Sequence, residues 1–88
     1  MPRVVITHAV ADMQRWLEGK AERVEAVASF GANVVDTVAL DGSNQVAVTL
    51  DVNDLAGMQA MLASPSPELA ALMEKHGVIP PFTVYAEK

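Results

Sequence analysis

The chain begins with a mostly apolar segment rich in β-branched residues, from residue 3 to residue 10. This pattern predicts a β-strand, whose successive side chains point to opposite faces. One face would carry Val4, Ile6, His8 and Val10, and the other Val5, Thr7 and Ala9. Both faces are apolar or small, and His8 is the only ionisable side chain between Val4 and Val10.

The pattern then changes to apolar residues spaced by three and four positions, which predicts an amphipathic helix. Asp12 is suited to cap its N-terminus. The predicted apolar stripe consists of Met13, Trp16, Leu17, Lys20, Val24 and Val27. We expect the pair Phe30-Gly31 to end this helix, with the glycine in the left-handed conformation.

Two further strands, 33–40 and 45–51, are predicted around the turn-forming segment Asp41-Gly42-Ser43-Asn44. Their faces again differ little in polarity. One face holds Val34, Asp36, Val38, Leu40, Val46, Val48 and Leu50, and the other holds Val35, Thr37, Ala39, Ala47 and Thr49. A sheet with one side in water would alternate more clearly, so we expect both sides to be covered.

The last third of the sequence predicts a broken helical region and a final strand. Helical spacing from residue 53 or 54 is interrupted by Ser64-Pro65-Ser66-Pro67, because proline cannot continue a helix. Ser66 is suited to cap a second helical stretch that ends at Gly77. Its apolar stripe comprises Leu69, Leu72, Met73 and His76. Residues 78–81 then lead into a strand over 82–86.

The order strand, helix, strand, strand, helix, strand predicts an α+β, ferredoxin-like β-α-β-β-α-β domain with a four-stranded antiparallel sheet. With 88 residues, we expect a single domain over 1–88. Both helical regions would lie on one face of the sheet. The other face is apolar, so we expect a homodimer in which two sheets pack face to face and close a shared barrel.

Composition narrows the possible partners and chemistry. The chain has no Cys, which excludes thiolate catalysis and thiolate metal ligation. Its net charge is −5, and no basic residue lies between Arg23 and Lys75, so neither nucleic acid nor an anionic membrane is an expected partner. The N-terminal residues contain no apolar run long enough for a signal peptide or membrane span, which makes a cytoplasmic location the expectation.

Scattered residues along nearly the whole chain resemble a known superfamily. They are Trp16, Arg23, the segment Asp41-Gly42-Ser43-Asn44-Gln45-Val46, Met73, Gly77-Val78 and Pro80-Pro81. In these positions the sequence is similar to the dimeric α/β-barrel superfamily, and most of all to small uncharacterised members, some labelled cyclase-like. The resemblance implies paired ferredoxin-like units with a pocket between sheet and helices.

Enzymes of that superfamily include cofactor-free quinone-forming monooxygenases, lactone isomerases, polyketide cyclases and haem-degrading enzymes. None of their catalytic motifs matches this chain residue by residue, so no catalytic role is carried over. Fold by itself does not define an activity.

His8 and Asp36 are the candidate catalytic residues, because each is ionisable and lies on an apolar strand. A neutral His8 would act as a general acid or base, and Asp36 would orient it if their strands are neighbours. Alternatively, His8 is a hydrogen-bonded core residue and Asp36 an edge-strand charge that discourages aggregation.

Five residues are candidate ligand-binding positions: Trp16, Lys20, Arg23, Thr49 and Tyr85. Trp16 would either pack in the core or stack on a ligand. Lys20 and Arg23 would bind a carboxylate at a pocket mouth or lay their stems over the core. Thr49 and Tyr85 would offer hydroxyl groups to a cavity or to a dimer interface. His76, in the last helical turn, is expected to interact with the helix dipole.

Two functions remain open from the sequence. The first is an enzyme without a metal or other cofactor, of the isomerase, cyclase or monooxygenase type, acting on a small apolar substrate. The second is a non-catalytic dimeric binding or interaction module. No metal site is expected, because the histidines and carboxylates lack ligand spacing.

Overall fold

The computed structural model describes residues 2–88. Its elements follow the predicted order, with each helical region divided in two. They are β1 (Arg3–Val10), α1 (Met13–Glu18), α2 (Lys20–Val27), β2 (Gly31–Val38), β3 (Gln45–Val52), α3 (Leu55–Ala63), α4 (Pro67–Lys75) and β4 (Val78–Ala86).

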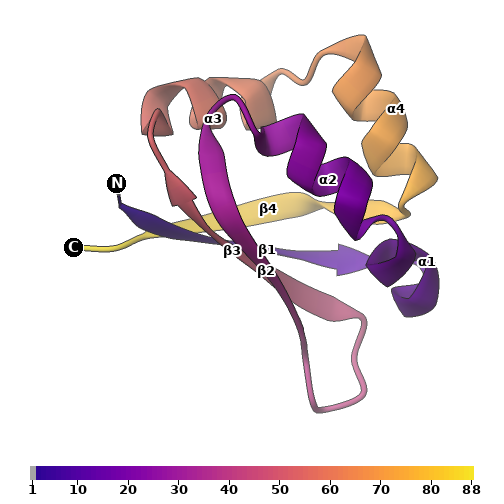
Figure 1. Ribbon diagram of the computed structural model, residues 1–88. Helices are drawn as coiled ribbons and strands as arrows, with labels where there is room; N and C mark the ends of the chain where they lie inside the picture. The colour runs from indigo at the N-terminus through magenta and orange to yellow at the C-terminus, as the bar shows by residue number, and fades with distance from the viewer. Residues whose placement is uncertain (1) are drawn as a thin grey trace.

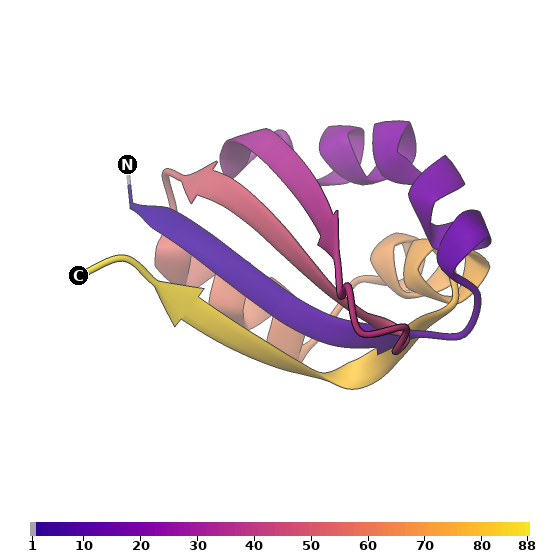
Figure 2. The ribbon, with the colours of Figure 1, turned by 90° about the horizontal axis from the view of Figure 1, so that it is seen from below.

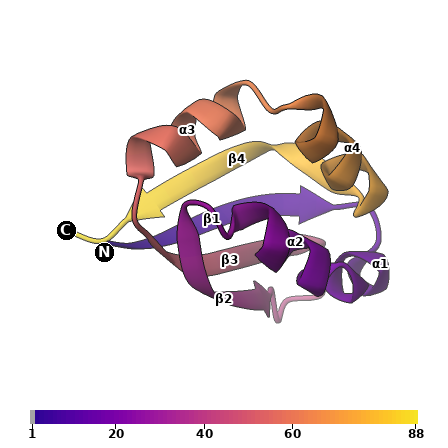
Figure 3. The same cartoon turned by 45° about the horizontal axis from the view of Figure 1, so that its top comes forward.

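The four strands form one antiparallel sheet in the order β2-β3-β1-β4. All the helices lie on one face of this sheet, with α2 over the β2 side and α3 and α4 over the β4 side (Figures 1 and 3). The predicted α+β, ferredoxin-like fold is therefore confirmed.

The first helical region contains a break that the sequence pattern did not predict. Asp12 caps α1 as expected, its side chain accepting a hydrogen bond from the Arg15 backbone N–H. Gly19 separates α1 from α2 and redirects the chain. As a result the predicted apolar stripe is only partly buried. Trp16 is fully buried, whereas Leu17 and Val24 are each 40% exposed.

Several strand boundaries differ from the prediction. Strand β2 begins and ends two residues earlier than predicted, and β3 ends one residue later. Gly31 does not adopt the left-handed conformation; it is the first residue of β2, and the residue with positive φ near it is Asn33, at 57°. The pairing of β2 with β3 shifts register between Ala32 and Val35, so Asn33 lies at a bulge. At the other end, β4 begins at Val78 rather than Phe82, because residues 78 and 79 already pair with β1.

The core lies between the sheet and the helices, in two clusters. The larger joins Val4, Leu50 and Val52 of the sheet to Phe30 and to Met58 of α3. The smaller joins Val10 and Val46 to Trp16 of α1. In β1 and β3, the buried residues therefore belong to the face that was predicted to turn toward the helices. This follows because successive side chains of a strand point to opposite faces.

The opposite face of the sheet has no helix over it (Figure 2). Its central row runs Val35, Thr49, Val5, Tyr85 across the four strands, and the next row runs Thr37, Ala47, Thr7, Thr83. We call these eight residues the open face. None of them is charged, and Val35 and Tyr85 are 49% and 58% exposed.

Across residues 2–88, the helices are too short and insufficiently apolar for any of them to cross a membrane.

Candidate functional site

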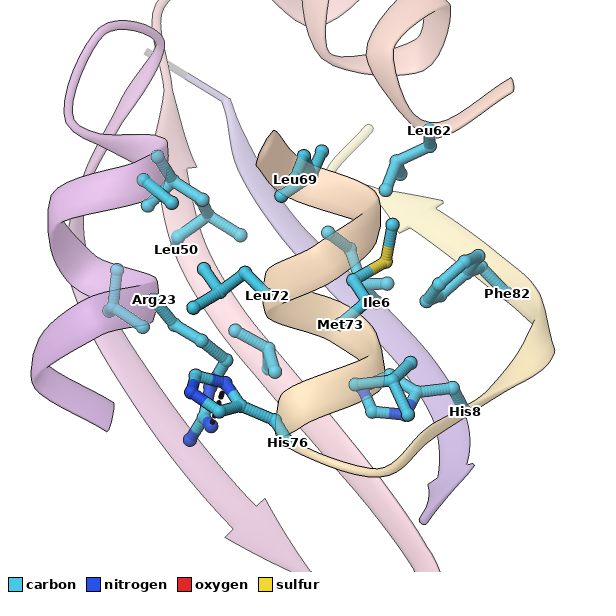
Figure 4. A pocket seen from close by; sticks show the side chains of 15 residues that line it. Ile6, His8, Arg23, Leu50, Leu62, Leu69, Leu72, Met73, His76 and Phe82 are labelled. Carbon is cyan, nitrogen blue, oxygen red and sulfur yellow. Dashed lines mark hydrogen bonds between the residues drawn. The ribbon is translucent and has the colours of Figure 1, made fainter. Parts of the chain in front are cut away.

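A cavity of about 100 Å³ lies between the sheet and helices α2 and α4. Most of its wall is aliphatic, supplied by Ile6, Val27, Val34, Val48, Leu50, Leu62, Leu69, Leu72, Met73 and Val78, together with Ala26 and Phe82. Its polar lining residues are His8, Arg23 and His76. His8 and His76 lie toward one end and Leu62 and Leu69 toward the other (Figure 4).

His8 enters the cavity from β1, where the alternation of the strand directs it toward the helices. Its ring meets Trp16 and Phe82 edge to face, with centroid distances of 5.9 and 5.5 Å. Nδ1 lies 2.9 Å from the carbonyl oxygen of Ala9. A carbonyl can only accept, so Nδ1 carries the proton and the neutral ring keeps a lone pair on Nε2.

Burial lowers the pKa of His8 below its ordinary value of 6.5. The hydrogen bond to Ala9 acts in the opposite direction, while the charge of Arg23 lowers the pKa further and that of Asp36 raises it. The net lowering keeps His8 neutral at pH 7, with Nε2 as a proton acceptor.

Arg23 and Asp36 form a buried ion pair beside the cavity. Nη2 of Arg23 donates to Oδ2 of Asp36 at 2.7 Å, and their side chains are only 13% and 4% exposed. Asp36 comes from β2 and faces the helices. Strand β3 separates β2 from β1, so the two strands are not neighbours and the condition for direct orientation of His8 by Asp36 is not met.

Trp16 links Arg23 to His8. The guanidinium carbon of Arg23 lies 4.1 Å from the centroid of the indole, a cation–π contact, and the same indole packs against the His8 ring. Nη1 of Arg23 also donates to the Trp16 carbonyl oxygen. Trp16 itself is fully buried and is not part of the cavity wall, so the structure gives it a packing position.

His76 lines the cavity, a role that the sequence analysis did not assign to it. It is the C-cap residue of α4, next to the helical turn in which it was expected, and it is only 2% exposed. Nη1 of Arg23 donates to its Nδ1 at 3.3 Å, which leaves the ring proton on Nε2, 3.6 Å from the Glu22 carboxylate. Burial lowers the pKa of His76, and Arg23 lowers it further. The signal in the sequence was its place on the apolar stripe of α4.

Several polar atoms at this end of the cavity lack a hydrogen-bond partner within residues 2–88. They are Nε1 of Trp16, Nε of Arg23, Oδ1 of Asp36 and Nε2 of His76. Unsatisfied buried polar groups are rare in native proteins. We call Trp16, Arg23, Asp36 and His76 the polar end of the cavity. Arg23 and His76 line the cavity, and Trp16 and Asp36 each contact Arg23.

The polar end is fixed to α4 by exposed charges as well. Lys75 donates to both carboxylate oxygens of Glu22 at 3.0 and 3.1 Å. Arg15 of α1 donates to the carbonyl oxygens of Glu74 and Lys75, which are among the free acceptors at the end of α4. These contacts hold helices α1, α2 and α4 together around the histidine.

The remaining predicted ligand-binding residues lie outside the cavity. Lys20 is exposed on α2. Thr49 and Tyr85 belong to the open face, each paired with Val5 of β1. Of the two places expected for their hydroxyl groups, a cavity or a dimer interface, the structure therefore excludes this cavity. Of the predicted site residues, the structure brings together His8, Trp16, Arg23 and Asp36. Among the described residues, no group of three or more His, Asp or Glu is placed to hold a metal ion.

No model of a known protein family matches the sequence, and no curated protein is similar to it. The fold, however, resembles solved structures. An antibiotic biosynthesis monooxygenase superposes with a TM-score of 0.65 at 13% identity, over 100% of this chain and 97% of its own.

Other structural neighbours are described as dimers. A dimeric protein of unknown function with a ferredoxin-like fold from Bacteroides fragilis has a TM-score of 0.57 at 12% identity, covering 99% of this chain and 94% of its own. A dimeric ferredoxin-like protein from an uncultured marine organism has a TM-score of 0.57 at 9% identity, covering 97% and 84%. At these identities the likeness establishes the ferredoxin-like fold, and the closer resemblance to cyclase-like members stays a prediction.

Proposed function

We propose that this protein is an enzyme that moves a proton on a small, largely apolar substrate bound in the cavity, with Nε2 of His8 as the base. The observation that supports this proposal most directly is the protonation state of His8. Its Nδ1–H is held by the Ala9 carbonyl, and burial keeps the ring neutral. A neutral imidazole has a ring nitrogen free to accept a proton, and histidine is the side chain that most often acts as a general base.

The cavity limits the size and polarity of the substrate. An engineered protein cavity of about 150 Å³ binds benzene, and this cavity of about 100 Å³ is smaller. A ring-sized substrate would fit once the wall gives slightly, and Met73 is the most adaptable side chain in it. The aliphatic wall would exclude water from the reacting atoms, which strengthens the electrostatic interactions made there and prevents side reactions with solvent.

Proton abstraction is the first step of isomerisation, of cyclisation and of the reaction of an apolar substrate with oxygen. One structural neighbour is described as an antibiotic biosynthesis monooxygenase. That description supports a small-molecule enzyme as the class of function. The same proton transfer would serve each of the three reaction types.

We further propose that the working form is a homodimer paired through the open face. This face carries no charge and includes the partly exposed side chains of Val35 and Tyr85, and exposed patches that contain such residues often mark interaction surfaces. Dimeric structural neighbours with the same fold support it. A non-catalytic dimer is the alternative, favoured by the same face but not by the neutral His8.

Cyclopentanone is a suitable probe, because it is a compact apolar ring with exchangeable C–H protons beside its carbonyl. We would follow exchange of these protons in D2O by NMR with the wild-type protein and with His8→Gln. General base catalysis typically contributes about 100-fold to 10,000-fold. We expect wild-type exchange to exceed that of the variant by at least about 100-fold. Binding without faster exchange would support the non-catalytic module instead.

A further inference from the structure

Arg23 contacts Trp16, Asp36 and His76, the other three residues of the polar end. It bonds to Asp36, to the backbone of Trp16 and to His76, and its guanidinium stacks on the Trp16 ring. Three elements thus converge on one side chain: β2, α1 and the end of α4. Arg23 is nevertheless not in direct hydrogen-bonding contact with His8, which it reaches through the indole.

We propose that Arg23 and Asp36 are positioning residues for His8: the pair fixes the Trp16 ring against which the imidazole rests, and the balance of its two charges sets how readily His8 takes a proton. The inference deepens the proposed function and rests on it for the role of His8 as a base. The charge balance can be measured without any substrate.

Geometry supports the first half of this proposal. The indole is confined between the guanidinium of Arg23 at 4.1 Å and the edge of the His8 ring at 5.9 Å. Asp36 prevents the guanidinium from rotating, since it holds Nη2 at 2.7 Å while His76 and the Trp16 carbonyl hold Nη1. His8 is fixed from its other side by Phe82 and by the Ala9 carbonyl.

The charges around His8 support the second half. The elements packed against it contribute three ionisable groups, namely Arg23 of α2, Asp36 of β2 and His76 at the end of α4. Strands β3 and β4 face the cavity only with apolar side chains. Arg23 lowers the pKa of His8 and Asp36 raises it, so the pair acts on the base with opposite signs. In a poorly hydrated site such effects are weakly screened.

The opposing signs provide a test that separates a charge effect from simple loss of structure. We would titrate the His8 ring by NMR in wild type, Arg23→Gln, Asp36→Asn and the double variant. Removing the positive charge leaves Asp36 unopposed, so Arg23→Gln should raise the pKa of His8. Asp36→Asn leaves Arg23 unopposed and should lower it, and the double variant should fall between the two.

A purely structural role gives a different result. Loosened packing admits water to His8, and the relief of desolvation raises the pKa in every variant. A rise in Asp36→Asn, or no change in either single variant, would therefore overturn the proposal. Asp36→Asn keeps the size of the side chain, so it alone decides the question should Arg23→Gln fail to fold.

Two controls complete the experiment. Arg23→Lys keeps the positive charge and should leave the pKa of His8 closer to wild type than Arg23→Gln does. Arg3→Gln removes an arginine whose partner is Asp51, at the other end of β1, and should leave His8 unchanged. If the protein does not accelerate cyclopentanone exchange but the titrations agree with expectation, the proposed enzymatic function is rejected. The proposed effect of Arg23 and Asp36 on the pKa of His8 would still hold.

Discussion

The buried ring of His76 occupies the space that a side chain on Gly19 would need. A Cβ built on Gly19 would come within 2.5 Å of Cε1 of His76, which is far inside van der Waals contact. The ring cannot easily move away, because it is 2% exposed and bonded to Arg23. The absence of a side chain at Gly19 thus leaves the space in which the ring of His76 packs.

We predict that Gly19→Ala destabilises the protein by about 1–3 kcal/mol, the usual cost of overpacking. Urea unfolding measures the loss. The added methyl group and the ring compete for one space, so Gly19→Ala should cost much less in a His76→Ala background than in the wild type. Equal costs in both backgrounds would show that the ring is not the obstacle.

Removing one partner of the Arg23–Asp36 pair leaves the other charge buried and uncompensated. We predict that Asp36→Ala lowers the free energy of unfolding by about 3–5 kcal/mol. A matched surface pair serves as control, because Arg3 bonds to Asp51 at 3.4 Å with the Arg3 side chain 56% exposed. Arg3→Ala should cost less than about 1 kcal/mol. Similar losses in both variants would contradict the burial argument.

The strands and helices that show a clear periodicity were predicted from the sequence. Features that depend on contacts between distant parts of the chain were not. The alternation in β1 correctly placed Val4, His8 and Val10 toward the helices. The need for glycine at position 19 could not be read from spacing, because a Cβ there would clash with the ring of His76, far along the chain. Helix propensity alone tolerates one interior glycine.

The candidate site was likewise predicted only in part. His8 was identified as an ionisable residue on a predicted apolar face and Arg23 as a candidate to bind a carboxylate, and both line the cavity. Their connection through Trp16 and Asp36 was not predictable, since strand order decides which residues meet. Thr49 and Tyr85 were assigned to either of two places, and the sheet register puts both on the open face.

Trp16 provides a further test of the core around the cavity. It is fully buried, whereas its neighbour Leu17 is 40% exposed. We predict that Trp16→Ala costs about 3–5 kcal/mol through the cavity it creates. Leu17→Ala, one position along the same helix, should change stability by only about 0.5 kcal/mol. Chemical unfolding of both variants compares them directly, and a loss below about 1 kcal/mol for Trp16→Ala would show that its contacts are not tight.

Both histidines make the stability dependent on pH, in a direction that their pKa values determine. Burial lowers the pKa of His8 and of His76 below 6.5, so the unfolded chain binds protons more readily than the folded one. Their contribution is complete above 6.5 and is lost as the pH falls through the lowered values. We predict that the urea midpoint decreases as the pH falls from about 7 to about 5.

This acid effect can be separated from that of the carboxylates. The pKa values of Glu22, Asp41 and Asp51 are lowered first by side-chain hydrogen bonds, so their contributions are lost only near and below 4.5 and 3.8. Variants His8→Gln and His76→Gln should each flatten the profile above about pH 5. A wild-type slope retained in both variants would show that other groups are responsible.

The open face gives the last prediction, which concerns assembly. Sedimentation at micromolar concentration should show twice the chain mass of 9.3 kDa. Val5 lies in the middle of the central row, between Thr49 and Tyr85, so Val5→Lys would place a charge in the centre of a sheet-to-sheet contact. We expect this variant to be monomeric, because a charge buried without a partner is strongly unfavourable. Val24→Lys is the control, since Val24 is 40% exposed on α2, on the helix side of the protein. It should remain a dimer, and a Val5→Lys dimer as stable as the wild type would mean that the two copies meet elsewhere.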